Sequence, residues 1–274
     1  MIIDGRNIAA DVLARTKARA QKLGCTPRIL AIVANETSAT KSYLAIKKKR
    51  AADAGCVLEE LHFDTHTATT EDLRTAVLSA DADAIIVQLP LAERMDSRII
   101  RDAIPPEKDA DVLSTVARMK FETDEYDALI PPVAGALAEI LSVNNIDPAG
   151  KKAVVIGKGA LVGSPCAKWL SHKKADVTHL SFRAGNFALL KDADIIVSGA
   201  GSPHFIKPEM ITEGVVLIDA GTSESGGALM GDADPSCADK CSIFTPVPGG
   251  VGPLAVAKLF ENAITLAERE NIDK

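Results

Sequence analysis

Short apolar runs alternate with helix-like segments along most of this chain, and this alternation limits what it can fold into. Runs with strand character, rich in Val, Ile and Leu, occupy residues 28–34, 56–63, 84–87, 153–156, 176–180, 195–197 and 215–219. Helical patterns lie between several of these runs, at residues 41–54, 69–79 and about 160–172. Such alternation is typical of βαβ units, which build parallel sheets. We therefore predict the α/β fold class.

A proline-rich, charged stretch separates the runs into two series. Residues 105–132 carry two Pro-Pro pairs, and a helix-like stretch follows at 135–143. A chain of 274 residues is long enough for two domains that each bury a core. The amphipathic pattern over 254–270 predicts a last helix that packs back on the first domain. We place one domain at 1–135 plus 254–274 and the other at 136–253.

Composition excludes several functional classes. A net charge of −6 without a basic tail argues against nucleic acid as a partner. The longest apolar runs fall far short of the roughly 20 residues that cross a bilayer, so no membrane partner is expected. The absence of a signal peptide and five scattered cysteines without C-x-x-C predict a cytoplasmic protein with reduced thiols. The pairs His62/His66 and Cys237/Cys241 lack further ligands at metal-binding spacing, so we predict no metal site.

A glycine-rich turn joins the strand at 153–156 to the following helix. It contains Gly157, Lys158, Gly159, Val162 and Gly163. Strand, glycine turn and helix form the setting in which a dinucleotide pyrophosphate binds at a helix N-terminus. The spacing differs from the commoner G-x-G-x-x-G, and a tight turn with a packing glycine is the alternative.

The end of the next strand indicates which dinucleotide would bind. A site for NAD usually has an acidic residue there, on the ribose 2′-hydroxyl. This chain has Ser181 and Arg183 instead, and Lys158 adds positive charge. These residues suit a 2′-phosphate and favour NADP, although a solvated loop arginine is the alternative.

Tyr43 and Lys47 are candidates for acid–base chemistry. Their i, i+4 spacing on a predicted helix puts both side chains on one face. A lysine in a dry pocket has a lowered pKa and can shuttle a proton. The alternative is that the basic run 47–50 is a solvated helix face.

Three further segments carry chemistry-bearing residues. Gln88 directly follows the strand at 84–87, where parallel sheets bind ligands. The K-D-A-D run at 108–111 could be a metal site, a ligand clamp or a helix cap. The stretch 245–253 packs three prolines and three glycines into nine residues, which suits a loop that must approach something closely or a rigid hinge.

Together these segments resemble the bifunctional methylenetetrahydrofolate dehydrogenase/methenyltetrahydrofolate cyclohydrolase family. The resemblance covers essentially the whole chain, and the proline-glycine stretch is its most specific part. The segments that carry it, in order, are Tyr43-x-x-x-Lys47, Val87-Gln88-Leu89-Pro90-Leu91, Lys108-Asp109-x-Asp111, Gly157-x-x-x-x-Val162-Gly163-x-Pro165 and the stretch 245–253.

The resemblance implies two α/β domains with a cleft between them, the second Rossmann-like. It implies that Lys47 transfers the proton in the cyclohydrolase step, that Gln88 tunes it and that Tyr43 partners it over the folate. Asp111 would hold the pterin ring. The cleft would be lined by Pro248, Gly249, Gly250 and Pro253, and NADP would be held by Gly157, Lys158, Gly159, Val162, Gly163, Ser181 and Arg183.

The implied function is NADP-dependent oxidation of 5,10-methylenetetrahydrofolate to the methenyl form and hydrolysis of that form to 10-formyltetrahydrofolate. This would be a homodimeric enzyme of one-carbon metabolism that serves purine biosynthesis. The chain departs from the family pattern at Val112, where glycine is usual, at Lys158-Gly159, where Arg-Ser is usual, at 130–133 and at Leu254-Ala255. The alternatives are another two-domain NADP enzyme, similar to shikimate dehydrogenase, and a non-catalytic nucleotide-binding regulator.

Overall fold

A computed structural model describes residues 1–35, 37–225 and 228–272. The chain divides into two compact units, each with a parallel sheet. Unit 1 comprises Met1–Ala9 and Val133–Ala255, and unit 2 comprises Ala10–Pro132 and Val256–Lys274. The predicted α/β class is confirmed.

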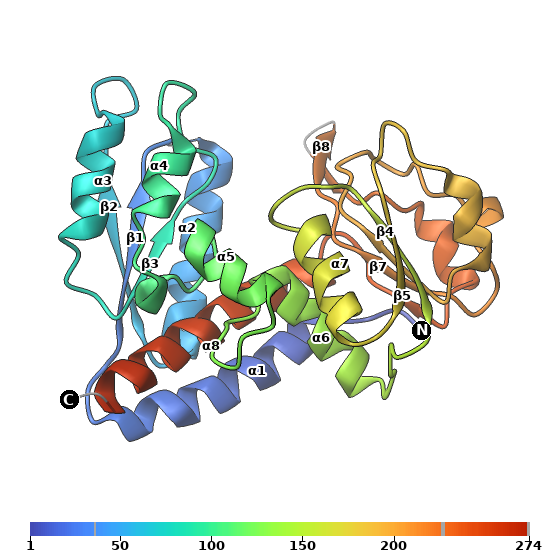
Figure 1. The fold of residues 1–274 in the computed structure, drawn as a ribbon, viewed down its shortest axis with the longest axis horizontal. Helices are drawn as coiled ribbons and strands as arrows, with labels where there is room; N and C mark the ends of the chain where they lie inside the picture. The colour runs from blue at the N-terminus through green and yellow to red at the C-terminus, as the bar shows by residue number, and fades with distance from the viewer. Residues whose placement is uncertain (36, 226–227, 273–274) are drawn as a thin grey trace. The chain divides into compact units, whose positions relative to one another are not determined.

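Unit 2 is built on a sheet of order β2-β1-β3. The central strand β1 (Arg28–Val33) pairs in parallel with β2 (Val57–His62) and with β3 (Ala84–Val87). β3 is buried along its whole length, which explains its continuous apolar run. Helices α2 (Ser38–Asp53), α3 (Thr70–Leu78) and α4 (Ser97–Asp102) lie beside these strands (Figure 1).

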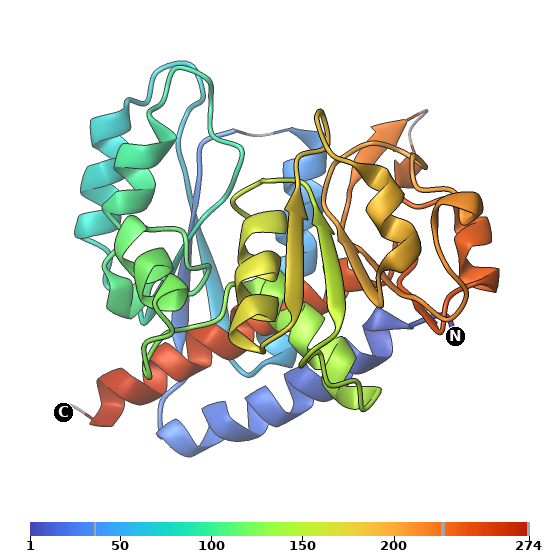
Figure 2. The same ribbon diagram turned by 45° about the vertical axis from the view of Figure 1, so that its right-hand side comes forward.

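Unit 1 is built on a sheet of order β10-β7-β6-β4-β5. Its strands, all parallel, are β4 (Lys152–Ile156), β5 (Asp176–Leu180), β6 (Ile195–Ser198), β7 (Val216–Asp219) and β10 (Ile243–Phe244). Helix α7 (Gly163–His172) connects β4 to β5 and lies beside them (Figure 2). It begins a few residues later than predicted because the glycine turn continues to Val162.

Both sheets reverse their direction of strand addition beside the first strand. In unit 1 the chain adds β5 on one side of β4 and β6 on the other. In unit 2 it adds β2 on one side of β1 and β3 on the other. Ligands of open α/β sheets bind outside the carboxyl ends of the strands at such a switch point. The fold therefore marks one candidate binding edge in each unit.

The remaining elements complete the two units. They are α1 (Gly5–Ala20), α5 (Thr115–Glu122), α6 (Pro132–Val143), the hairpin of β8 (Ser223–Ser225) and β9 (Ala228–Met230), and α8 (Val251–Ile272), besides short 3-10 turns. The parts of α1 and α8 that belong to unit 2 run side by side in both views (Figures 1 and 2). Arg15 Nη2 lies 3.2 Å from Glu261 Oε1, and Arg19 Nη2 lies 2.6 Å from Glu268 Oε2. No helix of the described residues is long and apolar enough to cross a membrane.

Candidate active site

Lys47 lies on the buried face of α2, although it begins the basic run 47–50, and such runs usually lie on a solvated helix face. Its exposed fraction is 9%, whereas Lys48 and Lys49 are exposed. The buried neighbours Leu44 and Ala51, one turn before and one turn after it, define the same apolar stripe. Lys47 is therefore the one member of the run that points into the protein.

The partner of Lys47 is Gln88. Lys47 Nζ donates a hydrogen bond of 2.9 Å to Gln88 Oε1. Gln88 follows β3 directly, and its backbone N–H continues the ladder to Ile32 O at 2.9 Å. Its side-chain Nε2 donates to Leu89 O at 2.8 Å, which orients the amide so that its oxygen faces the lysine. The amide is thus held at the switch point of the unit 2 sheet.

Asp111 completes this group, which we call the lysine cluster (Lys47, Gln88 and Asp111). Burial lowers the pKa of Lys47, and the charge of Asp111 opposes that shift. Burial raises the pKa of Asp111, while Lys47 lowers it and Asp109 raises it further. A buried amine beside an amide oxygen and a carboxylate is an arrangement that can accept and return a proton.

Asp109 has a different role from Asp111. Its carboxylate accepts the backbone N–H groups of Leu113, at 3.0 Å, and Ser114, at 2.7 Å. It therefore closes the turn that precedes α5, whose N-cap is Ser114 and not Asp109. The structure separates the two carboxylates of the D-x-D pair into a turn-forming residue and one that interacts with Lys47.

Val112 is the strained residue of the same turn. Its φ is +55°, a left-handed conformation that glycine adopts easily and a β-branched residue rarely does. This is the position at which the sequence departs from the glycine of the family it resembles. The departure thus leaves the turn in a conformation that costs about 1–3 kcal/mol and is sustained by surrounding contacts.

The glycine turn after β4 has one tightly packed part and one open part. A Cβ at Gly163 would collide with the carbonyl of Gly157, and one at Gly157, where φ is +98°, would collide with the carbonyl of Gly199. His179 Nε2 lies 2.9 Å from Gly157 O. A Cβ at Gly159, in contrast, would meet no atom within 4 Å. The packing alternative therefore accounts for two of the glycines and leaves the backbone at Gly159 open to a ligand.

The basic and hydroxyl groups around this turn are accessible. Lys158 and Arg183 are exposed, Ser181 and Val162 are partly buried, and β5 ends at Leu180, just before Ser181. No acidic residue occupies the segment 179–183. The fold brings these side chains to the carboxyl edge of β4 and β5 in the same unit. An open glycine turn with exposed cations fits a dinucleotide with a 2′-phosphate.

The proline-glycine stretch 245–253 packs against the N-terminal segment. Gly5 N–H donates to Gly249 O at 3.0 Å, and a Cβ at Gly5 would collide with the carbonyl of Gly250. Gly249 is left-handed, with φ +112°. The close approach expected for this stretch is thus, in part, an approach to the chain itself. Of the predicted lining residues, Pro248 is exposed, Gly249 and Gly250 are buried, and Pro253 is partly buried in the first turn of α8.

Tyr43 lies one turn before Lys47 on α2, as its spacing predicts. Its exposed fraction is 44%, so its ring is far more accessible than the lysine that it precedes. The helix begins at an N-cap on Thr37, whose hydroxyl accepts the N–H of Thr40 at 3.1 Å. An accessible aromatic ring one turn from a buried amine can contact a flat substrate ring.

Two buried carboxylates in unit 1 escaped the sequence analysis. Asp232 accepts Ser198 Oγ–H at 2.6 Å and the N–H groups of Ala200 and Ser202, both at 2.7 Å. Asp219 ends β7 and accepts Ala233 N–H at 2.8 Å, and burial raises its pKa to about 7. They fix the loops after β6 and β7. The position of Asp219 at the carboxyl end of a parallel strand was the available signal.

Comparison with known proteins agrees with this geometry. Residues 3–111 match the model of the tetrahydrofolate dehydrogenase/cyclohydrolase catalytic domain, and residues 131–271 match that of the family's NAD(P)-binding domain. The bifunctional protein FolD of Staphylococcus aureus is 37% identical over 278 aligned positions, which cover 98% of this chain and 96% of that protein.

Solved structures agree as well. The bifunctional FolD methylenetetrahydrofolate dehydrogenase/cyclohydrolase of Campylobacter jejuni superposes with a TM-score of 0.94 at 28% identity, covering 98% of this chain and 99% of that one. The FolD of Trypanosoma brucei, in complex with NADP and an inhibitor, has a TM-score of 0.92 at 30% identity, covering 98% of each chain.

Proposed function

The chain belongs to the tetrahydrofolate dehydrogenase/cyclohydrolase family, and from this premise we propose the reaction that it catalyses. It oxidises 5,10-methylenetetrahydrofolate to 5,10-methenyltetrahydrofolate with NADP and hydrolyses the product to 10-formyltetrahydrofolate. The family match and the named relatives support this reaction. They do not support the alternatives of a shikimate-dehydrogenase-like enzyme or a non-catalytic regulator.

The observation that carries the hydrolytic step is the 2.9 Å hydrogen bond from the buried Lys47 to Gln88. Hydrolysis of the methenyl cation requires water to attack its one-carbon bridge and lose a proton. Burial lowers the pKa of Lys47, which increases the fraction of neutral amine that can accept this proton.

Lys47 then returns the proton to N5 as the bond between N5 and the bridge carbon breaks. The second proton of the water passes to solvent, so that a cation and water give neutral 10-formyltetrahydrofolate and one free proton. Gln88 keeps the amine aimed through its oriented amide oxygen.

The folate itself would be held by Asp111 and Tyr43. A carboxylate accepts two hydrogen bonds from the amino-pyrimidine edge of a pterin, which is a pairing that fixes the ring plane. The exposed ring of Tyr43 offers a stacking surface one turn from Lys47. These contacts position the bridge carbon, and positioning supplies a large part of the catalysis.

The cofactor side rests on the glycine turn. The open backbone at Gly159 would take the pyrophosphate at the start of α7, in the turn that the packed Gly157 and Gly163 shape. Ser181, Arg183 and Lys158 would take the 2′-phosphate. NADP, when bound, supplies the nicotinamide that accepts a hydride. The fit is supported by the open backbone at Gly159 and by the exposed cations.

The remaining assignments extend this proposal. We assign folate chemistry to residues 1–135 plus 254–274 and the cofactor to 136–253, where the Pro248–Gly250 segment and Pro253 would contact the substrates. We also assign a cytoplasmic location and a homodimer, both carried by the family resemblance. Sedimentation velocity of the purified protein tests the dimer, and a single species of 28.8 kDa would contradict it.

The direct test of function is a two-stage assay. The protein is mixed with NADP and 5,10-methylenetetrahydrofolate while NADPH absorbance is followed, and 5,10-methenyltetrahydrofolate is then supplied alone while its absorbance decays. We expect both signals. Shikimate in place of the folate is the control, and NADPH formation from shikimate alone would contradict the proposal.

A further inference from the structure

We propose that Asn262, on helix α8, is a positioning residue that sets the Asp111 carboxylate against Lys47. The inference rests on the proposed function, because it takes Asp111 to bind folate. Asn262 belongs to none of the sequence motifs described above. More than half of the chain separates it from Asp111, yet both belong to unit 2.

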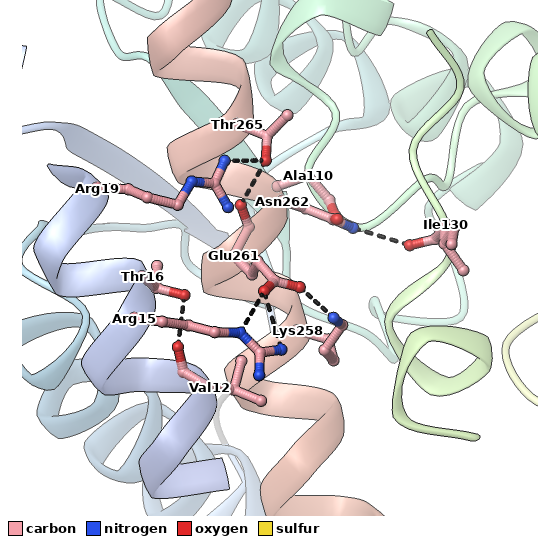
Figure 3. A network of polar contacts seen from close by, with 10 residues as sticks. All are labelled: Val12, Arg15, Thr16, Arg19, Ala110, Ile130, Lys258, Glu261, Asn262 and Thr265. Atoms are coloured by element: carbon pink, nitrogen blue, oxygen red, sulfur yellow. Dashed lines mark hydrogen bonds and ion pairs between the residues drawn. The ribbon is translucent and has the colours of Figure 1, made fainter. Parts of the chain in front are cut away.

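The contacts of Asn262 point to this role. Its Nδ2 points toward the backbone of Ala110 and Ile130 (Figure 3) and donates to Ala110 O at 3.0 Å and to Ile130 O at 2.9 Å. Its exposed fraction is 8%. Ala110 is the residue between Asp109 and Asp111, and it is fully buried. One amide group thus anchors the peptide that precedes Asp111 and the segment that leads to α6.

The turn needs such an anchor because it is strained. Val112 holds a left-handed conformation that opposes a β-branched side chain. On the C-terminal side of Val112, the Asp109 carboxylate accepts the N–H groups of Leu113 and Ser114. On its N-terminal side, Asn262 donates a hydrogen bond to Ala110 O. Asp111 lies between these two attachment points, so loss of the Asn262 bond lets the turn relax and moves the Asp111 carboxylate.

Other polar contacts of α8 differ from this one. Arg15 with Glu261 joins α8 to α1 on the side of the helix that faces α1 (Figure 3). Arg19 with Glu268 joins the same two helices. These contacts serve to pack two helices. Asn262, in contrast, donates both of its N–H groups to backbone carbonyls of irregular segments. The backbone conformation of such segments depends on bonds of this kind.

The test compares Asn262→Leu with Asn271→Leu. Asn271 lies on the same helix and donates to Leu23 O at 3.5 Å at an exposed position, so it controls for the loss of an asparagine from α8. Calorimetric titration measures the affinity for a non-reactive folate analogue and for NADP. A pH profile of methenyltetrahydrofolate hydrolysis reports on Lys47.

We expect Asn262→Leu to weaken the folate analogue by about tenfold or more, which corresponds to about 1.4 kcal/mol, and to leave NADP affinity unchanged. The pH profile should also move to lower pH. The charge of Asp111 raises the pKa of Lys47, so a carboxylate that drifts away lets that pKa fall. A packing defect alone would not move the profile.

A second substitution tests the strain at Val112. Glycine adopts a left-handed conformation without steric cost, so the double variant Asn262→Leu/Val112→Gly should keep the turn in place and recover part of the lost folate affinity. Asn262→Ser, which is too short to reach both carbonyls, serves in the same assays if the leucine variant does not fold.

The proposal is overturned if Asn262→Leu lowers only the melting temperature and matches Asn271→Leu in folate affinity and pH profile. Asp111→Ala, titrated in parallel, separates the two levels of the account. If Asp111→Ala keeps its folate affinity, the proposed function of Asp111 is wrong. If Asp111→Ala loses it and Asn262→Leu does not, the positioning inference is wrong.

Discussion

Each sheet carries its candidate residues at the edge where its strand order reverses, but the residues are held differently in the two units. In the lysine cluster of unit 2 the groups hold one another, since Lys47 donates to Gln88 at 2.9 Å and interacts with the charge of Asp111. In the glycine turn of unit 1 the backbone is packed at Gly157 and Gly163, and the side chains of Lys158 and Arg183 are exposed.

The difference follows from the chemistry expected on each side. A proton-transfer group works only if its pKa is set before the substrate arrives, which requires burial and fixed partners. A cation that binds a phosphate needs only to be free and correctly placed, because the ligand supplies the partner. The lysine cluster thus suits proton transfer and the glycine turn suits phosphate binding. Each can be disrupted by substitutions that leave the other intact.

The largest effect should come from Lys47→Ala. Loss of a positioned acid–base group typically costs about 10²–10⁴-fold in rate, and here it should fall on hydrolysis of methenyltetrahydrofolate. NADPH formation from methylenetetrahydrofolate should stay measurable, because hydride transfer depends mainly on positioning. Parallel assays of both reactions check this. An equal loss of both activities, with NADP still bound, would mean that Lys47 mainly positions folate.

Arg183→Ala tests the open turn. Hydrogen bonds to charged groups contribute about 1.5–3 kcal/mol, so NADP should bind about 10- to 100-fold more weakly. NAD, which lacks the 2′-phosphate, should be little affected. Calorimetric titration of both dinucleotides is the measurement, with Lys191→Ala as an exposed basic control in the same unit. If both affinities fall together, Arg183 does not recognise the 2′-phosphate.

Gln88→Glu should give a smaller effect, seen as a change in pH dependence. A carboxylate in place of the amide favours the protonated amine and raises the pKa of Lys47, so hydrolysis should fall near neutral pH and recover at higher pH. We expect the profile to move upward by about one unit. Gln88→Leu removes the hydrogen bond without adding charge and should not cause an upward shift. An unchanged pH profile in the glutamate variant would show that Gln88 does not influence the pKa of Lys47.

Much of the fold could be predicted from the sequence, because buried parallel strands are continuous apolar runs. The run at 84–87 has the bounds of β3, which is buried at every residue. The predicted run at 176–180 also has the bounds of β5, although that strand is only partly buried. Helix α1 was missed, although its buried residues Ala9, Val12, Leu13 and Thr16 follow helical spacing. The hairpin β8–β9 has strands of three residues, which are too short for a periodic signal.

The motifs of the site could be predicted from the sequence, but the hydrogen bonds that hold its residues in place could not. The helical spacing of Lys47 with Leu44 and Ala51 is a local signal for its burial. Its hydrogen bond to Gln88, 41 positions away, has no such signal. Asn262 and Asp232 were missed for a similar reason. The contact of Asn262 with Ala110 joins residues 152 positions apart, and no local pattern encodes such a pair.

The most direct test of the whole account is calorimetric titration of Asp111→Ala with a folate analogue and, separately, with NADP. Asp111 belongs to the lysine cluster of unit 2, and the predicted dinucleotide-binding residues lie in unit 1. We expect the variant to lose folate affinity, because the pterin donors have no acceptor, and to bind NADP as the unmodified protein does. Retained folate affinity, or a parallel loss of NADP affinity in the folded variant, would contradict this expectation.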